Sequence, residues 1–509
     1  MAQGPIRIAN QELLLADLRV PLAGPCEVTL EAEAREALIA SQEAVAKLLR
    51  GEQPIYGVNT GFGKLAKARI AAEDLGQLQI NLVRSHAAGT GEPLDIGTVR
   101  LIMVLKLASL ARGYSGIQPE TARRLMELIN HDVVPVVPGQ GSVAASGDLA
   151  PLAHLSLVLI GEGEAWVKSR RMAGGAALRY AGIKPSVLGP KEGLALLNGT
   201  QVSTAIALHA LVNTEQIMQA AIVAGAMAVD AIKGSDTPFD SRIHAVRPHP
   251  GQMTLAALYR KLLNGSAIRA SHLTEDDKVQ DPYSFRCQPQ VMGAALDVLR
   301  FAARTLLVEA NSVSDNPLVF AKDGEVLSGG NFHAEPVAFA ADMMALAIAE
   351  IGSISERRIA ELTDTTISEL PPFLVKEPGL NSGYMIAHVT AAALASENKM
   401  LAQPASVDSL PTSANQEDHV SMATHGALRL HRMNANTEGI TAIELLAAAD
   451  GLDFRRPLKS SEPLESAHAI IRSKIRRRLA DREFGSDIER ARGLIRNGKF
   501  AQLVGPLLE

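Results

Sequence analysis

Three small residues, Ala145-Ser146-Gly147, stand in a glycine-flanked stretch that runs directly into an apolar helical segment, 152–160. Asp148 suits the N-cap of that helix, and Pro151 suits its first turn, where a missing N–H costs nothing. The small residues would then lie at the positive end of a helix dipole, which favours developing negative charge. The same pattern is also typical of an ordinary loop that caps a helix.

Other polar residues gather at the breaks between predicted helices, where a helical bundle can line a site. An arginine at such a break can bind a carboxylate through two hydrogen bonds, and a glutamate can hold a basic ring. Together they indicate a pocket for a zwitterion, although each stretch is equally compatible with helix capping. The stretches are Asn198–Gln201, Lys278–Cys287, Gly329–His333 and Asn415–His419.

Two further segments hold side chains able to act on a substrate. Tyr56 lies within 55–63, where three glycines favour a movable lid over a pocket. A structural tyrosine in a flexible connection is the alternative. His86 is followed by Ala87-Ala88-Gly89, and a lone histidine beside small residues more often has a packing role than a binding role.

Several other kinds of site find no support in the sequence. There is no cysteine pair and no His-Glu-x-x-His motif, so we expect no metal. Neither a G-x-G-x-x-G loop after a strand nor a P-loop occurs, so we expect no nucleotide cofactor. A serine hydrolase is excluded because no G-x-S-x-G motif is found.

The composition limits the partners and the compartment. A net charge of −5 provides no basic surface for nucleic acid. Cys26 and Cys287 are the only cysteines, which excludes a disulfide framework and favours a reducing compartment. No signal peptide is recognised, and the longest apolar run, 220–229, is too short to span a membrane. We therefore expect a cytoplasmic protein with neither nucleic acid nor membrane as a partner.

Long helices must position these residues. Hydrophobic residues make up 47% of the chain but aromatic residues only 4%, a mixture that favours close-packed helices. Several predicted helices approach thirty residues, or roughly 45 Å. Many are apolar on more than one face, which indicates burial in one bundle shared between subunits. The predicted helices are 29–50, 73–88, 98–112, 119–131, 200–233, 288–312, 334–362, 383–402 and 418–450.

The remaining segments are shorter. Strand-like pieces are predicted within 4–28, a small hairpin around 165–168, and a second hairpin that joins 318–320 to 325–327. We expect a domain over 1–195 that holds the lid and the Ala-Ser-Gly segment. A central long-helix bundle over 196–455 and charged peripheral helices over 456–509 would complete the chain.

The motifs, taken together, resemble one known family over nearly the whole chain. Gly141–Leu149 resembles the signature of the aromatic amino acid ammonia-lyases, and most closely of the members that act on histidine. Further stretches that resemble this family, in the family's order, are Tyr56–Gly63, Ser85–Gly89, Leu197–Gln201, Gln280–Ser284 and Asn415–His419. The resemblance implies an all-α fold with a long fumarase- and aspartase-like helix bundle, small β-hairpins and peripheral helices, assembled as a homotetramer with shared active sites.

The resemblance also implies a prosthetic group made from the chain itself. The amide nitrogen of Gly147 would attack the carbonyl carbon of Ala145, and the loss of two waters, including the hydroxyl of Ser146, would leave 4-methylidene-imidazole-5-one (MIO). Such an electrophile is needed because ammonia is a poor leaving group and the β-proton of the substrate is weakly acidic. Ordinary side chains supply no electrophile of that strength.

The family's functional residues map onto matching positions of this chain. Tyr56 resembles the lid tyrosine that acts as general base, which requires a pKa below its ordinary value near 10. Arg286 would bind the substrate carboxylate, and Asn198 would hydrogen-bond the prosthetic ring. Tyr283 and Phe332 would line and order the site.

Substrate choice within the family depends on His86 and Glu417, which resemble the pair that binds imidazole. Relatives that act on phenylalanine or tyrosine usually carry glutamine in place of Glu417, whereas a carboxylate suits imidazole. One departure from the pattern is Ala144, where these enzymes usually have glycine. Its methyl group would slow ring closure or shift the substrate.

The resemblance therefore predicts the non-oxidative deamination of L-histidine to trans-urocanate and ammonia. A histidine 2,3-aminomutase, which returns the amine to the β-carbon, is the main alternative because it would use the same prosthetic group. A catalytically inactive helical scaffold is a remote third possibility.

Overall fold

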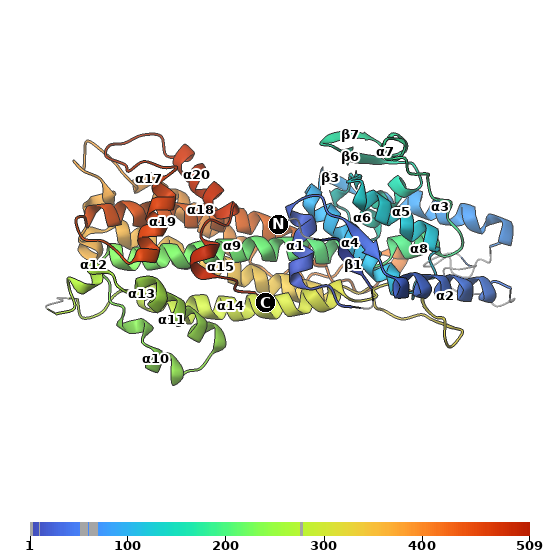
Figure 1. Cartoon of the computed structure of the whole chain (residues 1–509), viewed down its shortest axis with the longest axis horizontal. Coiled ribbons are helices and arrows are strands. Elements are labelled where there is room, and N and C mark those ends of the chain that lie inside the picture. Colours follow the sequence, from blue (N-terminus) through green and yellow to red (C-terminus); the bar gives the residue numbers. More distant parts are fainter. Residues whose placement is uncertain (1–3, 10, 51–59, 61–69, 275–277, 509) are drawn as a thin grey trace. The chain divides into compact units, whose positions relative to one another are not determined.

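The computed structural model describes residues 4–9, 11–50, 60, 70–274 and 278–508, and helices dominate this part of the chain (Figure 1). The predicted all-α architecture with long helices and small sheets is confirmed. The structure divides into two compact units, each made of three segments. Unit 1 comprises 1–209, 304–342 and 404–428, and unit 2 comprises 210–303, 343–403 and 429–509.

Four long helices each contribute residues to both units, because a unit boundary falls inside each of them. They are α9 (Gln201–Ala231), α14 (Gln288–Ala310), α15 (Glu335–Thr363) and α18 (Ala423–Phe454). All four were predicted within a few residues, except that α18 begins at Ala423 and not at 418. The sequence predicts three consecutive domains, which divide the chain differently from these two units, and that division stays a prediction.

Unit 1 is built around α4 (Ile96–Ala111), which is buried on nearly every side. The Asp95 carboxylate accepts hydrogen bonds from the backbone nitrogens of Gly97 and Thr98 and so caps this helix. The other helices of unit 1 are α1 (Leu15–Ala23), α2 (Ala32–Leu48), α3 (Leu75–His86), α5 (Pro119–Asn130), α6 (Leu149–Leu159), α7 (Gly174–Ala181) and α8 (Glu192–Leu197).

Small sheets join the helices of unit 1. β1 (Ile6–Ile8) pairs with β2 (Val28–Leu30) in parallel, and all other pairs are antiparallel. These other pairs are β3 (Thr90–Pro93) with β5 (Pro138–Gln140), β4 (Val134–Pro135) with β6 (Glu164–Val167), β6 with β7 (Arg170–Ala173), and β8 (Leu318–Phe320) with β9 (Glu325–Leu327). Both predicted hairpins are thereby confirmed.

Within 4–28, the prediction of a strand-like piece around Pro21 is wrong. Residues 15–23 form α1, with Pro21 inside the helix. Leu15, Leu18 and Pro21 are its buried residues, at a spacing of three that puts them on one helix face. Tertiary packing of that face, with α1 lying against α4, outweighs the local preference of proline against a helix interior.

Unit 2 is a helical bundle with polar contacts between its long helices. Arg358 of α15 donates two hydrogen bonds to Glu444 of α18, and both side chains are fully buried. Thr214 of α9 donates to Asn434 of α18 at 3.0 Å. The other helices of unit 2 are α10 (Ser241–Ala245), α11 (Pro250–Leu263), α12 (Ala267–Ala270), α13 (Tyr283–Arg286), α16 (Thr365–Ser368), α17 (Met385–Leu401), α19 (Glu462–Arg472), α20 (Gly485–Arg496) and α21 (Ala501–Val504).

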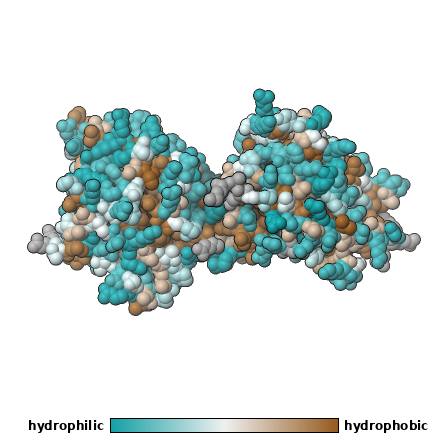
Figure 2. All heavy atoms as spheres, in the orientation of Figure 1, coloured by the Kyte–Doolittle hydropathy of each residue, from teal (hydrophilic) through white to brown (hydrophobic). Residues whose placement is uncertain are grey.

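Among the described helices, only α15 is long and apolar enough to cross a membrane, and 61% of its most apolar window is buried within the protein. Its buried ion pair with α18 is typical of a bundle helix. The surface seen in Figure 2 is mostly hydrophilic, with hydrophobic residues in bands between the polar ones. Large apolar side chains that are more than half exposed include Leu346 of α15 and Ile386 and Val389 of α17.

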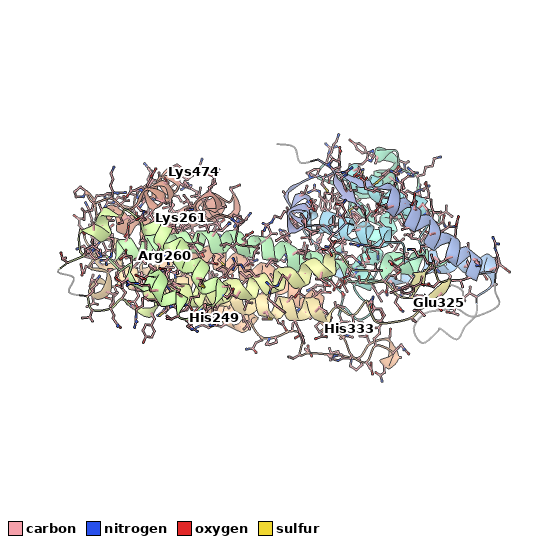
Figure 3. The ribbon with its side chains drawn as sticks, turned by 60° about the horizontal axis from the view of Figure 1, so that its bottom comes forward. His249, Arg260, Lys261, Glu325, His333 and Lys474 are labelled. Carbon is pink, nitrogen blue, oxygen red and sulfur yellow. The ribbon has the colours of Figure 1, made fainter. Side chains whose placement is uncertain are left out.

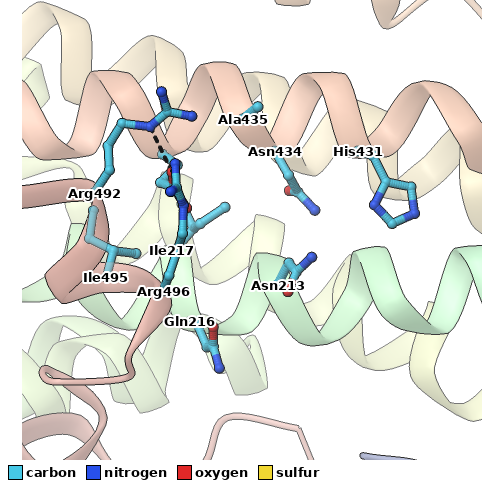
Figure 4. A pocket seen from close by; sticks show the side chains of 10 residues that line it. Asn213, Gln216, Ile217, His431, Asn434, Ala435, Arg492, Ile495 and Arg496 are labelled. Atoms are coloured by element: carbon cyan, nitrogen blue, oxygen red, sulfur yellow. Dashed lines mark hydrogen bonds and ion pairs between the residues drawn. The ribbon is translucent and has the colours of Figure 1, made fainter. Parts of the chain in front are cut away.

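A polar pocket of about 320 Å³ lies in unit 2 between α9, α18 and α20. Asn213 and Gln216 line it from α9, and His431 and Asn434 from α18 (Figure 4). Its two arginines, Arg492 and Arg496, are both ion-paired with Glu438. The glutamate neutralises much of their charge, which makes this pocket a poor candidate for an anionic substrate.

Candidate active site

The Ala-Ser-Gly segment lies in a tight loop of unit 1 that contains several left-handed backbone conformations. Gly141 and Gly147 have φ values of 125° and 74°, and Ala144 has a φ of 54°. Glycine adopts such values freely, but an alanine methyl group in this region is strained by about 1–2 kcal/mol. Ala144 is also fully buried. The departure from glycine that the sequence shows at this position therefore falls where the backbone conformation favours glycine.

Asp148 holds this loop in place from within. Its buried carboxylate accepts hydrogen bonds from the hydroxyl of Ser142 at 2.9 Å and that of Thr424 at 2.5 Å. Ser203 donates to it from both its backbone nitrogen, at 2.8 Å, and its hydroxyl. Burial raises the pKa of Asp148, and these four hydrogen bonds oppose that rise.

The predicted N-cap role of Asp148 is corrected by this geometry. Asp148 does precede α6, but its side chain makes no capping hydrogen bond to that helix. The carboxylate instead binds the backbone nitrogen of Ser203, the third residue of α9. The loop therefore lies at the start of α6 and is tied to the start of α9.

Gly147 lies directly against the chain that enters α9. It forms a parallel bridge with Gly199, and the nitrogen of Asp148 donates to the oxygen of Gly199 at 2.7 Å. A Cβ on Gly147 would come within 2.2 Å of that same oxygen. The third residue of the Ala-Ser-Gly triad must therefore be glycine, both for its φ and for its close packing.

Asn198 contacts the triad directly. Its side-chain nitrogen donates to the backbone oxygen of Ser146 at 3.0 Å, while its side-chain oxygen is buried without a hydrogen-bond partner among the described residues. The backbone oxygen of Asn198 in turn accepts a 2.6 Å hydrogen bond from the fully buried ammonium of Lys106. Burial lowers the pKa of Lys106 to about 8, while Asp315 opposes this change and Lys191 adds to it.

Glu417 approaches the triad from a strained loop. One carboxylate oxygen accepts from the hydroxyl of Ser146 at 3.0 Å, and the other accepts from the hydroxyl of Thr412 at 2.5 Å. Thr412 and Glu417 also pair through their backbones. Between them, Ser413, Ala414 and Asn415 all have positive φ values, from 50° to 63°. Strain of this kind concentrates at functional sites, and here it holds a carboxylate against Ser146.

The loop after Glu417 packs against the loop that holds the triad. Ala145, Val420 and Met422 form one buried apolar cluster, with Val143 against it. The nitrogen of Met422 donates to the oxygen of Val143 at 3.1 Å. The sequence places these two segments about 270 residues apart, and the fold brings them together in unit 1.

His86 and Phe332 belong to the same unit but have no described contact with the triad. His86 ends α3, and its Nδ1 lies 2.8 Å from the oxygen of Leu82. The chain that follows His86 enters β3, which pairs with β5 just before Gly141. Phe332 is half-buried, and its neighbour His333 stacks on His419 in the Glu417 loop.

Two of the other predicted residues lie in unit 2. Tyr283 and Arg286 stand at the two ends of α13, with the guanidinium carbon of Arg286 4.6 Å from the centre of the Tyr283 ring. The Nε of Arg286 is buried without a hydrogen-bond partner among the described residues. Tyr56 lies outside the described residues.

The structure adds residues that the sequence interpretation did not place at the site. Lys106, Ser203 and Thr424 support the triad through Asn198 and Asp148. Only Lys106 offers a local signal, as the one charged residue within the largely apolar run 101–111.

The segments present fit a prosthetic ring built from the triad. The ring closure would join the nitrogen of Gly147 to the carbonyl carbon of Ala145, and glycine occupies the position where an added Cβ would have no room. The unpartnered oxygen and the donating nitrogen of Asn198 are polar groups already placed at the backbone of Ser146.

Comparisons with known proteins show the family of this chain. A model of the aromatic amino acid lyase family matches residues 13–473. The fold is similar to that of a histidine ammonia-lyase from Trypanosoma cruzi, with a TM-score of 0.91, 40% identity, and coverage of 99% of this chain and 96% of that one.

Aminomutases are similar as well. The tyrosine aminomutase from Streptomyces globisporus has a TM-score of 0.93 at 33% identity, with 98% of each chain covered. The phenylalanine aminomutase of Pantoea agglomerans has a TM-score of 0.92 at 29% identity, with 97% of this chain and 99% of that chain covered. With a matching family model over most of its length and these relatives, the chain belongs to the aromatic amino acid lyase family and is an enzyme of the ammonia-lyase type.

Proposed function

We propose that this enzyme converts L-histidine to trans-urocanate and ammonia, with MIO formed from Ala145, Ser146 and Gly147 as its electrophile. The observation that carries the choice of substrate is the Glu417 carboxylate, which accepts a hydrogen bond from Ser146 at 3.0 Å. Formation of MIO removes the hydroxyl of Ser146, which frees this carboxylate oxygen for the N–H of an imidazole ring, whereas a phenyl ring offers no donor to it.

The prosthetic group, when formed, supplies an electron sink that activates the amine and the β-proton of the substrate. Asn198 holds a donor 3.0 Å from the oxygen of Ser146, where negative charge would gather in the reaction. The positive end of the α6 dipole stabilises this negative charge further, as does the positive charge of Lys106, which binds the backbone oxygen of Asn198.

The remaining roles rest on the family resemblance. Tyr56 takes the β-proton as general base, and Arg286 binds the substrate carboxylate. His86 and Glu417 hold the imidazole, and Tyr283 and Phe332 line the pocket. We further propose a cytoplasmic homotetramer with shared active sites. The exposed apolar residues of α15 and α17, Leu346, Ile386 and Val389, support burial against other subunits.

A histidine 2,3-aminomutase is the second candidate, because the tyrosine aminomutase at 33% identity shares nearly the whole fold. Product analysis after incubation with L-histidine separates the two. Trans-urocanate with equimolar ammonia supports the lyase, whereas accumulation of β-histidine supports the aminomutase.

An inactive scaffold is tested by the intact mass of the purified chain. Formation of the ring removes two waters and adds near-ultraviolet absorbance from a conjugated system. A chain with its full mass, without this absorbance and without turnover of histidine would overturn both enzymatic proposals.

A further inference from the structure

We propose that His333, Glu335 and His419 form a binding site for a divalent cation at the edge of the active-site loops. All three residues belong to unit 1, and Figure 3 labels His333. One potential ligand atom from each residue lies within 4.8 Å of those of the other two. Two imidazoles and one carboxylate are a donor set typical of zinc and other divalent transition metals.

The hydrogen bonding of His333 fixes which ring nitrogen faces the carboxylate. The Nε2 of His333 lies 3.3 Å from the backbone oxygen of His419. A carbonyl oxygen only accepts hydrogen bonds, so Nε2 carries the proton in this contact, and the neutral ring has its lone pair on Nδ1. This arrangement, in which one ring nitrogen donates to a backbone carbonyl and the other is left bare, is the usual one for a histidine that binds a metal.

The bare Nδ1 faces a second electron-pair donor. It lies 3.8 Å from the Oε2 of Glu335, too far for a hydrogen bond. Two atoms each bound to one zinc ion at about 2.1 Å are about 3.4 Å apart in a tetrahedral site, so the observed separation accommodates an ion between them with a small adjustment.

The Glu335 carboxylate gives a second reason to expect a bound cation. Its Oε2 is buried and has no hydrogen-bond partner among the described residues. Glu335 is the first residue of α15, where the helix dipole favours its charge but provides no hydrogen bond to this oxygen. A buried carboxylate oxygen without a donor is costly, and a bound cation removes that cost.

His419 supplies the third ligand from the opposite loop. Its ring stacks on that of His333 with a centroid separation of 5.8 Å and an interplanar angle of 16°. His419 is exposed, so its side chain can turn to the ion without disturbing the core. The three protein ligands leave one position of a tetrahedral site for water.

Occupancy of the site would join two loops that the active site uses. His333 follows Phe332, and His419 lies two residues after Glu417. The binding of the ion does not depend on the proposed function, although its effect on histidine turnover does.

The test is a titration of the full-length protein after removal of bound metals with a chelator. Isothermal calorimetry with Zn²⁺ and the visible absorption of added Co²⁺ should both report one ion per chain. His333→Ala and Glu335→Gln should each weaken Zn²⁺ binding by at least about tenfold, by analogy with the 10–100-fold losses seen on removal of metal-supporting groups. His249→Ala is the matched control, because His249 is an exposed histidine of unit 2 (Figure 3), and it should bind Zn²⁺ like the unmodified protein.

The outcomes distinguish this site from binding of Zn²⁺ elsewhere on the chain. Absence of Zn²⁺ binding would overturn the proposal. A Zn²⁺ affinity of the His333→Ala and Glu335→Gln proteins equal to that of the unmodified protein would also overturn it, and would assign the bound ion to another group such as Cys287. Circular dichroism and urea unfolding of the metal-free proteins identify a variant that fails to fold. His419→Asn, at an exposed position, then serves as a further ligand variant, and unchanged affinity in it would also contradict the site.

Discussion

The carboxylate of Asp148 binds the backbone nitrogen of Ser203 at 2.8 Å and thereby caps α9 and not the helix that Asp148 precedes. Because the same carboxylate also binds Ser142 and Thr424, one buried side chain connects the triad loop, α9 and α18 within unit 1. The position of the triad thus depends on residues that are 55 and 276 positions away from Asp148 in the sequence.

Asp148→Asn should lower the free energy of unfolding by roughly 1–3 kcal/mol, because the amide places a donor where hydrogen bonds are now accepted. Urea unfolding measures this change. Asp323→Asn, at the exposed turn between β8 and β9, is the control and should have little effect. An unchanged unfolding midpoint for Asp148→Asn would show that the carboxylate does not hold the loop.

Ala144→Gly should relieve the strain of a φ of 54°, worth about 1–2 kcal/mol. The gain is offset by about 0.4–1 kcal/mol, because glycine increases the entropy of the unfolded chain. We therefore expect a stability equal to or up to about 1 kcal/mol above that of the unmodified protein, and faster appearance of the ring absorbance after folding. Ala228→Gly, within α9, should instead destabilise by about 1 kcal/mol. A loss of stability of similar size in Ala144→Gly would contradict backbone strain at Ala144.

Glu417→Gln should reduce the turnover of histidine about 10- to 150-fold, the equivalent of a charged hydrogen bond worth about 1.5–3 kcal/mol. The glutamine side chain can still accept from Ser146 or Thr412, so ring formation should continue. Steady-state kinetics and intact mass test both parts. Glu325→Gln, on the exposed strand β9 (Figure 3), should leave turnover unchanged. Unchanged kinetics in Glu417→Gln would remove this residue from substrate binding.

The lowered pKa of Lys106, about 8 in the folded chain against 10.5 for the ordinary side chain, predicts a pH dependence of stability. Between these values the unfolded chain binds the proton and the folded chain does not, so stability rises with pH across the window and is lost as pH falls through about 8. The full difference is on the order of 3 kcal/mol. Between pH 8 and 10.5, the free energy of unfolding measured with urea should rise more steeply with pH for the unmodified protein than for Lys106→Met. Parallel curves would contradict the lowered pKa of Lys106.

Arg358→Met should destabilise the bundle of unit 2 by about 3–5 kcal/mol, because it leaves the fully buried Glu444 without its cation. Arg432→Met removes a similar ion pair with Glu397, but Arg432 is 65% exposed, so the cost should stay below about 1 kcal/mol. Thermal or urea unfolding compares the two variants. Equal losses of unfolding free energy in the two variants would show that burial does not determine how much the loss of an ion pair destabilises the protein.

Much of the fold could be predicted from periodicity and turn residues. The long helices α9, α14 and α15 and the hairpin of β8 and β9 follow directly from their local patterns. Local patterns failed where packing decides. Residues 15–23 are helical despite Pro21, and α18 begins at Ala423 and not at 418, because Met422 directly before it has a positive φ of 57°.

Only part of the candidate site can be compared with the sequence-based prediction, and its contacts could not be predicted. The motifs indicated the triad, Asn198 and Glu417, and the structure brings these together. The pairing of Asp148 with Thr424, and that of His333 with His419, joins segments far apart in the chain with no shared spacing to reveal it. Such contacts follow only from the complete fold.

The division of four long helices between the two units has a consequence for any attempt to dissect this enzyme. A cut at 209, 303, 342 or 428 would sever a helix in its interior and leave backbone amides and carbonyls there without their hydrogen bonds. Neither half can therefore be obtained as an independent fragment by shortening the gene. Each unit therefore needs the uninterrupted polypeptide in order to fold.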